Sequence, residues 1–248
     1  MGQSAIEVKN LRKVYKDAPV AAVNDLTFSI EQGSIFGLLG PNGAGKTTTL
    51  SILCGLIKAT SGEATILGLS LKNKTQEIKQ IIGVVPQEIA LYPTLTAYEN
   101  LRYIGNMYGL RGKNLKNKIQ ENLEIVGLST HTHHRIETFS GGMKRRINLV
   151  AGILHTPKVL FLDEPTVGVD VQSRNLITEH LHLLNNQGCT IIYTSHLMEE
   201  AENLCSAIAI IDHGEIIASG KPKDVIKEHQ TENLEQLFLK LTGKTLRD

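Results

Sequence analysis

Residues 40–47 read GPNGAGKT, and this segment constrains the fold of the chain more than any other. It matches the pattern G-x-x-x-x-G-K-[ST] at every position. A short apolar run over residues 34–40 leads into it, and residues 46–57 follow with apolar side chains at helical spacing. A buried strand, a glycine-rich loop and a helix in this order form a phosphate-binding loop. The sequence therefore predicts an α/β core with a nucleotide site where that strand ends.

Each residue type in this phosphate loop (residues 40–47) suits the binding of phosphate. Glycines let the backbone wrap closely around phosphate oxygens, and successive amides and a helix N-terminus present partial positive charge. Lys46 is predicted to bridge the β- and γ-phosphates, and Thr47 to offer its hydroxyl to Mg²⁺. A glycine-rich turn with a chance Lys-Thr pair is the alternative, which the strand–loop–helix context disfavours. The predicted nucleotide contacts are Gly40, Pro41, Asn42, Gly43, Ala44, Gly45, Lys46, Thr47 and Thr48.

A second segment, residues 159–165 with the sequence VLFLDEP, places two carboxylates at the end of an apolar run. The run is typical of another buried strand. Asp163 is predicted to hold Mg²⁺ through water, and Glu164 to polarise the attacking water as general base. A strand capped by a solvated acidic pair is the alternative. The phosphate loop upstream favours the catalytic interpretation.

The rest of the chain alternates short β-rich runs with helical patterns, which predicts a mostly parallel sheet. The first thirty residues differ, because their alternation is typical of antiparallel strands. Residues 88–139 contain no strand-like run and carry two helical patterns, at 96–108 and 115–126. The predicted fold class is α/β: a P-loop NTPase core with a mostly parallel sheet, an N-terminal antiparallel β-subdomain and an inserted helical subdomain.

We predict a single ATPase domain over residues 1–248. Its catalytic core comprises residues 1–87 and 140–220, its helical insert residues 88–139, and its C-terminal helical tail residues 221–248.

Composition argues against several other classes of protein. The chain has 26 Lys and Arg against 25 Asp and Glu, and a net charge of +1 does not favour a nucleic-acid partner. Cys54, Cys189 and Cys205 lack metal-type or redox-type spacing, which favours free thiols in a reducing cytosol. No apolar run reaches the roughly 18 residues that span a bilayer. Any work at a membrane is therefore expected to pass through a partner.

Residues 139–146, FSGGMKRR, narrow the family. This segment precedes VLFLDEP and resembles the signature of ABC ATPases, usually written LSGGQ. Gln87, Asp170 and His196 occur in the order of that family's Q-loop, D-loop and H-loop, and Tyr15 lies where the family stacks an aromatic ring on adenine. The ordered set is far more specific than any one motif. The chain therefore resembles ABC ATPases over essentially its whole length.

The resemblance implies a mechanism shared between two subunits. ABC ATPases form head-to-tail pairs with two ATP molecules at the interface, so a second ATPase subunit, in a homodimer, is the implied partner. Ser140, Gly141 and Gly142 would present donors and a helix dipole to the γ-phosphate bound by the other subunit. Asp170 would shape the interface between the two subunits.

Within one subunit, the resemblance implies that His196 contacts the γ-phosphate and that Gln87 touches Mg²⁺ or the attacking water. Tyr15 would stack on adenine. Each residue also has an ordinary interpretation: a strand-end Gln, a helix-start His, a packing Tyr and, at Ser140, a helix cap. All of these would have to hold at once, in the family's order. ATP and Mg²⁺ are the implied cofactors, and the implied metal ligands are Thr47, Gln87 and Asp163.

The signature departs from the usual family pattern, with Phe139 in place of Leu and Met143 in place of Gln. These departures, Val167 and Val169 in EPTVGVD, and the tail resemble the single-domain ATPases of ABC-2-type exporters. That group includes drug-resistance, sodium-export and polysaccharide-export systems. The resemblance implies a separate multi-span membrane permease as partner. It also implies a peripheral position on the cytoplasmic face of the cell membrane.

A soluble ABC ATPase that acts on nucleic acid or ribosomes is the alternative function. Translation-associated members carry two ATPase domains in one chain, and chromosome-maintenance or repair relatives carry long coiled coils or zinc inserts. This sequence has one ATPase domain, no sustained heptads and no CxxC. A non-hydrolysing regulatory subunit is a further alternative, in which Glu164 or His196 would be absent, and both are present.

The segment that follows Gln87 is predicted to bind the membrane partner. Within residues 88–98, Tyr92 and Leu95 are apolar enough to line a groove for a partner helix. A charge introduced at Leu91 or Tyr92 is expected to uncouple transport and leave basal ATPase activity intact. The alternative is that these side chains pack inside the helical insert.

Overall fold

A six-stranded sheet runs through the molecule in the order β10–β9–β3–β8–β7–β6. The computed structural model describes residues 3–16 and 19–243. Neighbouring strands from β9 to β6 pair in parallel, and the edge strand β10 is antiparallel to β9. The strands are β3 (Ile35–Leu39), β6 (Ile82–Val85), β7 (Val159–Asp163), β8 (Thr190–Ser195), β9 (Ala207–Asp212) and β10 (Glu215–Gly220).

The central strands are interior because almost all their side chains are apolar. β3, β7 and β8 are buried at every position, which is typical of parallel strands covered on both faces. β10 instead alternates exposed and half-buried residues, and its sequence did not lead us to predict a strand. The mostly parallel sheet is thus confirmed, with an antiparallel edge as an addition.

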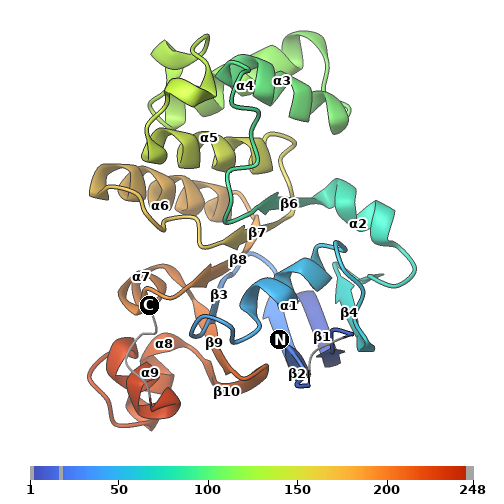
Figure 1. Cartoon of the computed structure of the whole chain (residues 1–248), viewed down its shortest axis with the longest axis vertical. Helices are drawn as coiled ribbons and strands as arrows, with labels where there is room; N and C mark the ends of the chain where they lie inside the picture. The colour runs from blue at the N-terminus through green and yellow to red at the C-terminus, as the bar shows by residue number, and fades with distance from the viewer. Residues whose placement is uncertain (1–2, 17–18, 244–248) are drawn as a thin grey trace.

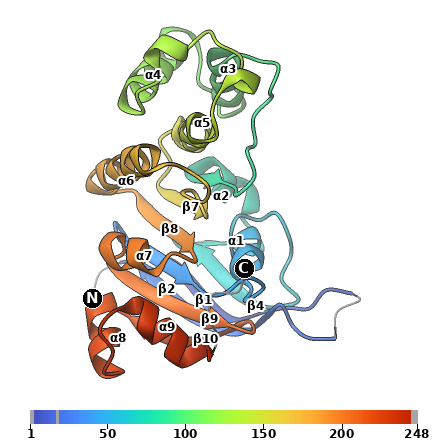
Figure 2. The same cartoon turned by 60° about the vertical axis from the view of Figure 1, so that its left-hand side comes forward.

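A second sheet of four antiparallel strands, in the order β2–β1–β4–β5, lies beside the first (Figures 1 and 2). It confirms the antiparallel prediction for the first thirty residues. The strand β4 was not predicted, because its first three residues are exposed and give no apolar alternation. The strands are β1 (Ser4–Lys13), β2 (Val23–Glu31), β4 (Ser61–Ile66) and β5 (Leu69–Ser70).

Nine α-helices among the described residues cover these sheets and build the upper part of Figure 1. Alternate side chains of the central sheet enter two different cores. On β7, Leu160 and Leu162 pack with side chains of α5 to α9, whereas Val159 and Phe161 pack with α1 and the antiparallel sheet. The helices are α1 (Lys46–Leu53), α2 (Thr75–Ile81), α3 (Ala97–Met107), α4 (Gly112–Ile125), α5 (Gly141–Ile153), α6 (Val171–Asn186), α7 (Met198–Leu204), α8 (Pro222–Glu228) and α9 (Leu234–Thr242).

A third core lies between α3, α4 and α5, at the end of the molecule far from the antiparallel sheet (Figures 1 and 2). α3 begins with a capping box, in which Thr96 Oγ1 accepts from the Glu99 amide at 3.1 Å and Glu99 Oε2 accepts from the Thr96 amide at 2.8 Å. α5 belongs to both regions, because Leu149 packs in the central core and Val150 in the third. The boundary at residue 139 therefore stays a prediction.

α5 lies directly on β6. A Cβ built on Gly83 would lie 2.2 Å from the carbonyl oxygen of Gly152, and one built on Gly152 would lie 2.5 Å from Val85 Cγ2. Neither position has room for a side chain. Glycine at both positions therefore lets the backbones of the helix and the strand touch.

The end of the described chain forms α8 and α9. The apolar stripe of α9 is largely interior, because Leu234 and Leu237 are buried and Leu241 packs partly buried against the same core. Residues 1–2 and 244–248 of the predicted domain lie outside the described residues. Within the residues that the structure describes, no helix has both the length and the apolar character needed to cross a membrane.

Candidate active site

The phosphate loop follows β3 and leads into α1, which begins at Lys46. Two of its glycines touch neighbouring backbone. A Cβ on Gly40 would lie 2.3 Å from the carbonyl oxygen of Ile211, and one on Gly45 would lie 2.3 Å from that of Ala22. Gly45 also has a φ of 104°, a left-handed conformation that favours glycine. The loop is thus fixed by close backbone contacts with β9 and with the residue before β2.

The ammonium group of Lys46 reaches back over this loop. Its Nζ donates to the carbonyl oxygens of Gly40 at 2.7 Å and Pro41 at 3.1 Å, and the residue is only 5% exposed. Burial lowers the pKa of Lys46, and the negative charges of Glu164 and Asp163 oppose that shift. A buried ammonium beside an open ring of backbone amides is suited to bind an anion.

Glu164 lies at the centre of the site, immediately after β7. Its Oε1 is 3.8 Å from Lys46 Nζ and 3.3 Å from His196 Nδ1, and its Oε2 accepts from Gln87 Nε2 at 3.3 Å. The Glu164 side chain is 8% exposed. Three residues that are far apart in the sequence thus meet one carboxylate. This convergence is what a general base near a phosphate would require.

Asp163 ends β7 and is 8% exposed. Its Oδ1 accepts from Thr194 Oγ1 at 2.7 Å, and the same Thr194 oxygen accepts from the Glu164 amide at 3.0 Å. Sequence reasoning missed Thr194, although its place two residues before His196 could have indicated it. Thr47 is exposed in the first turn of α1.

Five residues that meet around the Glu164 carboxylate are called the Glu164 group below: Lys46, Gln87, Asp163, Glu164 and His196.

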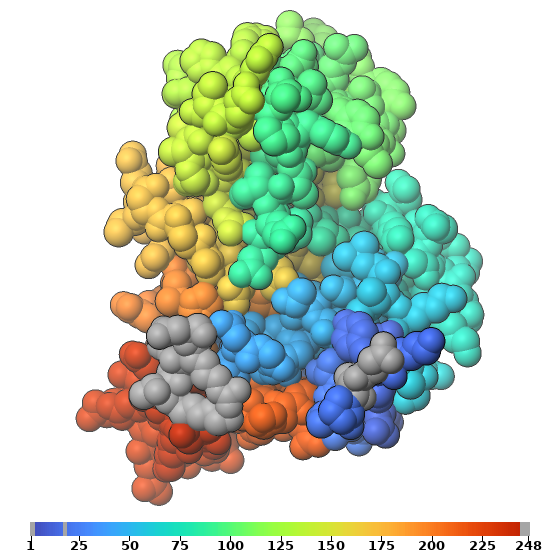
Figure 3. Space-filling view, in the orientation of Figure 1, coloured from blue at the N-terminus to red at the C-terminus, as the bar shows by residue number. Residues whose placement is uncertain are grey.

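Gln87 lies in the segment between β6 and α3, which runs along the surface in Figure 3. The side chain of Asn148 on α5, only 2% exposed, holds this segment: it accepts from the Ala90 amide at 3.1 Å and donates to the Pro86 carbonyl at 3.2 Å. Arg145, also on α5, donates to the Gln87 carbonyl. Sequence reasoning missed both side chains, because nothing in the pattern shows that α5 packs on this segment.

Tyr15 lies beside the first turn of α1. Its Oη is 3.5 Å from Thr48 Oγ1, and Lys13 Nζ lies 5.2 Å from the centre of its ring, a cation–π contact. The ring is 44% exposed. An exposed aromatic face next to the phosphate loop is suited to stack on a nucleotide base, and this role stays a prediction.

The signature residues form a second cluster, at the start of α5. Ser140 caps the helix, because its Oγ accepts from the Met143 amide at 3.2 Å. A Cβ on Gly142 would lie 2.7 Å from Asp170 Oδ2, so the signature and the start of α6 are neighbours. Ser140, Gly141 and Asp170 are exposed. This cluster is called the Ser140 group below and comprises Ser140, Gly141, Gly142 and Asp170.

The sequence and the structure were compared with known proteins. A protein-family model described as ABC transporter matches residues 23–167. The linearmycin resistance ATP-binding protein LnrL of Bacillus subtilis is 52% identical over 220 residues, which are 89% of this chain and 70% of that protein. The probable multidrug ABC transporter ATP-binding protein YbhF of Escherichia coli is 39% identical over 245 residues, which are 97% of this chain and 42% of that protein.

Two solved structures have a similar fold. The structure of an ATP-binding subunit of an ABC transporter superposes with a TM-score of 0.88 at 28% identity, covering 96% of this chain and 99% of that one. The dimeric structure of an ATP-binding cassette in a post-hydrolysis state, bound to ADP and phosphate, superposes with a TM-score of 0.80 at 27% identity. That match covers 87% of this chain and 98% of the other.

Proposed function

Because this chain belongs to the ABC transporter family and is an ATPase of that family, we propose that it hydrolyses ATP at the Glu164 group and energises a membrane exporter. The observation that carries this proposal is the convergence of Lys46, Gln87 and His196 on the Glu164 carboxylate, at 3.3–3.8 Å. The names of the relatives, a resistance protein and a multidrug transporter, support export over action on nucleic acid or ribosomes.

Hydrolysis would proceed with the phosphates of ATP in the phosphate loop. Lys46 would exchange its bonds to the Gly40 and Pro41 carbonyls for bonds to β- and γ-phosphate oxygens. Glu164 would take a proton from water as the water oxygen bonds to the γ-phosphorus. The bond from that phosphorus to the β–γ bridging oxygen breaks, which leaves ADP and phosphate. Gln87 and His196 would orient the water and the γ-phosphate.

Mg²⁺ fits the donors present at this site. The hydroxyl of Thr47, the carboxylate of Asp163 and the amide oxygen of Gln87 are hard oxygen ligands of the kind that Mg²⁺ prefers. When bound, the ion would neutralise charge on the phosphates. Thr194 keeps Asp163 oriented through its 2.7 Å hydrogen bond.

The Ser140 group would complete the site of a second, identical chain in a head-to-tail pair. Its helix N-terminus and the Ser140 hydroxyl are exposed, as a contact with a partner's γ-phosphate requires. One similar structure is a dimer with bound ADP and phosphate, which supports this arrangement. Asp170, which caps α6 through the Ser173 amide at 2.8 Å, would lie at the same interface.

A multi-span permease is the proposed membrane partner, with this chain peripheral on the cytoplasmic face. Leu91, where a charge was expected to act on the partner alone, is only 8% exposed and packs in the third core, so a charge there would also disturb the fold. Tyr92 and Tyr103 are about half exposed and stack edge to face at 5.5 Å, and Met107 is 69% exposed nearby on α3. Asn100, fully buried, fixes Tyr92 by accepting from its amide at 2.8 Å. The exposed side chains of Tyr92, Tyr103 and Met107 suit contact with a partner helix.

The variant Glu164→Gln tests the catalytic part of the proposal, because an amide keeps the shape of the carboxylate and cannot take the proton. We expect turnover to fall at least about a hundredfold. Binding of ATP with Mg²⁺ should persist, and light scattering should then show a mass of two chains. Normal turnover would contradict the role of Glu164, and a persistent monomer would contradict the pairing.

A further inference from the structure

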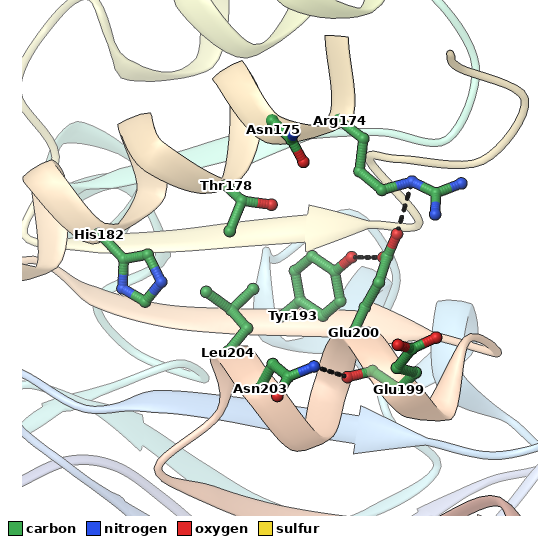
Figure 4. A pocket seen from close by; sticks show the side chains of 9 residues that line it. All are labelled: Arg174, Asn175, Thr178, His182, Tyr193, Glu199, Glu200, Asn203 and Leu204. Atoms are coloured by element: carbon green, nitrogen blue, oxygen red, sulfur yellow. Dashed lines mark hydrogen bonds and ion pairs between the residues drawn. The ribbon is translucent and has the colours of Figure 1, made fainter. Parts of the chain in front are cut away.

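A largely buried carboxylate outside the Glu164 group connects α6, α7, β8 and the turn after β7. Glu200, on α7, has a side chain that is 14% exposed. Its Oε2 accepts from Tyr193 Oη on β8 at 2.5 Å and from Thr166 Oγ1 at 2.7 Å. Its Oε1 forms an ion pair with Arg174 Nε on α6 at 2.9 Å. Figure 4 shows Arg174 and Tyr193 reaching this carboxylate from two sides.

Glu200 is the acceptor that the hydroxyls of Thr166 and Tyr193 share. The hydroxyls of Thr166 and Tyr193 lie 3.0 Å apart, and each also reaches Glu200. Each hydroxyl has one proton to donate, and Glu200 accepts both. Burial raises the pKa of Tyr193 well above its usual value, so its hydroxyl stays protonated as a donor. Thr166 is 2% exposed and Tyr193 is 1% exposed. Without Glu200, the two hydroxyls could bond only to each other, and one of their two protons would have no buried acceptor.

Thr166 lies two residues after Glu164, and the Glu164 backbone is strained. Glu164 has a φ of 48°, in the left-handed region that residues other than glycine rarely adopt. Such a conformation is strained and persists only where its surroundings fix it. Before the turn, β7 fixes the chain, and the Glu164 amide donates to Thr194 at 3.0 Å. After the turn, the bond from Thr166 to Glu200 is the anchor.

The same carboxylate also fixes both neighbours of the catalytic turn. His196 lies just before α7, the helix that carries Glu200. Arg174 lies on α6, which begins after Asp170. Movement of Glu200 would therefore disturb the turn at Glu164, the approach of His196 and the start of α6 together.

We propose that Glu200 is a positioning residue, which keeps Glu164 in its strained conformation by anchoring Thr166 against β8 and α7. Glu200 does not touch the reacting atoms in this assignment. Glu200 acts through Thr166 and Tyr193. This assignment rests on the proposed ATPase role of Glu164. The predicted consequence is that the chemical step needs Glu200, whereas nucleotide binding by the phosphate loop does not.

Glu199, the neighbour of Glu200 in the sequence, provides a matched control. Both residues line a pocket of about 270 Å³. Glu199 lines the same pocket and is exposed, and the contact drawn for it in Figure 4 is through its backbone oxygen, which accepts from Asn203 Nδ2 at 3.0 Å. Glu199→Gln therefore removes a neighbouring charge and leaves the Glu200 contacts intact.

The test compares kcat, the Kd for ATP and the melting temperature in the full-length chain. For Glu200→Gln and Thr166→Val we expect kcat to fall about ten- to a hundredfold, because a small displacement of a catalytic group has effects of that size. The Kd for ATP should stay within about twofold, since the phosphate loop is unchanged. Thr166→Ser keeps the hydroxyl and should restore most of kcat, and Glu199→Gln should match the wild type.

A purely structural role makes a different pattern, in which the melting temperature falls while kcat, measured well below melting, stays at the wild-type value. That result in Glu200→Gln, or equal kcat values for Thr166→Val and Thr166→Ser, overturns the inference. If Glu200→Gln does not fold, the Thr166 pair alone decides. A wild-type chain without ATPase activity would instead contradict the proposed function and not this assignment in particular.

Discussion

The Glu164 group and the Ser140 group differ in how completely one chain satisfies them. The charged centre of the Glu164 group is buried, because the side chains of Lys46 and Glu164 are 6% and 8% exposed and lie 3.8 Å apart. Gln87 in the same group is exposed, and His196 is half-buried. The Ser140 group is mostly exposed, and the Ser140 side chain caps the start of α5 by accepting from the Met143 amide. In the proposed mechanism, the first group is complete within one chain, and the second is half of an interface between two chains.

The difference follows from electrostatics. Buried charges are costly unless they are paired, so the Glu164 group had to be assembled inside one chain. A helix N-terminus at the surface costs little, since water satisfies its amides until an anion replaces the water. The comparison therefore predicts that damage to the first group acts within one chain, whereas damage to the second acts on its partner.

The largest effect is expected when the Glu164 group loses its cation. Lys46→Ala removes the positive charge that faces Glu164 and the phosphates, and turnover should fall by at least about a hundredfold. A steady-state phosphate-release assay measures this, with the exposed Lys9→Ala as control. Turnover near the wild-type value would remove the phosphate loop from the mechanism.

A smaller but still large effect is expected in the Ser140 group. Gly141 has open space around it, since the nearest atom to a built Cβ is the Gly168 carbonyl oxygen at 4.0 Å. Gly141→Asp should therefore fold normally and repel the partner's γ-phosphate, with turnover lower by about ten- to a hundredfold. Binding of ATP to the separate chain should be unchanged, which equilibrium dialysis can check.

The same change at Gly142 would be a poorer test. A Cβ there would lie 2.3 Å from Ser173 Oγ, so Gly142→Asp would also force α5 away from α6. Its loss of activity would mix packing with charge. Unchanged turnover in Gly141→Asp would mean that this helix start does not face phosphate.

Mixing the two damaged chains gives the sharpest form of the comparison. In a head-to-tail pair, the Glu164 group of Gly141→Asp meets the intact Ser140 group of Lys46→Ala, which rebuilds one site. With random pairing and independent sites, activity should return to about a quarter of the wild-type value. A mixture as inactive as its two components would contradict sites that draw one group from each chain.

A moderate effect is expected where α5 touches both groups. Asn148→Ala would leave the Ala90 amide and the Pro86 carbonyl without their buried partner, at a cost of about 1–3 kcal/mol in unfolding free energy. Gln87 would lose part of its support, and turnover should fall several-fold. Urea unfolding with phosphate release measures both, against the exposed Asn114→Ala. A variant with wild-type values for both quantities would show that the segment does not depend on α5.

The smallest effect is expected at the unusual residue of the signature. The Met143 amide bonds to Ser140 Oγ, and its half-buried side chain packs against the third core. Met143→Gln keeps a straight chain and a similar helix propensity, so turnover should stay within about twofold. An inactive variant would mean that the side chain itself contacts phosphate.

Sequence patterns predicted the parts of the molecule that depend on local chemistry. The phosphate loop, the apolar strands and the acidic pair at 163–164 are contiguous, so spacing alone reveals them. Asn148 and Glu200 could not be predicted, because each contacts a backbone or side chain at least 34 residues away through tertiary packing. Thr194 acts across a similar distance, and only its place two residues before His196 could have indicated it. Edge strands such as β10 were missed since one open face removes the apolar signal.

The close contact between Gly83 of β6 and Gly152 of α5 gives the helix a pivot point on the strand. Because the helix and the strand pack so closely here, we expect a change in the direction of α5 to pivot about this point. Ser140 lies twelve residues from Gly152 along the helix, which is about 18 Å at 1.5 Å per residue. A tilt of α5 by about 10° would move Ser140 by about 3 Å. Asn148, which holds the segment around Gln87, lies closer to the pivot point than Ser140 does. The same tilt would therefore displace that segment by a smaller distance than it displaces Ser140.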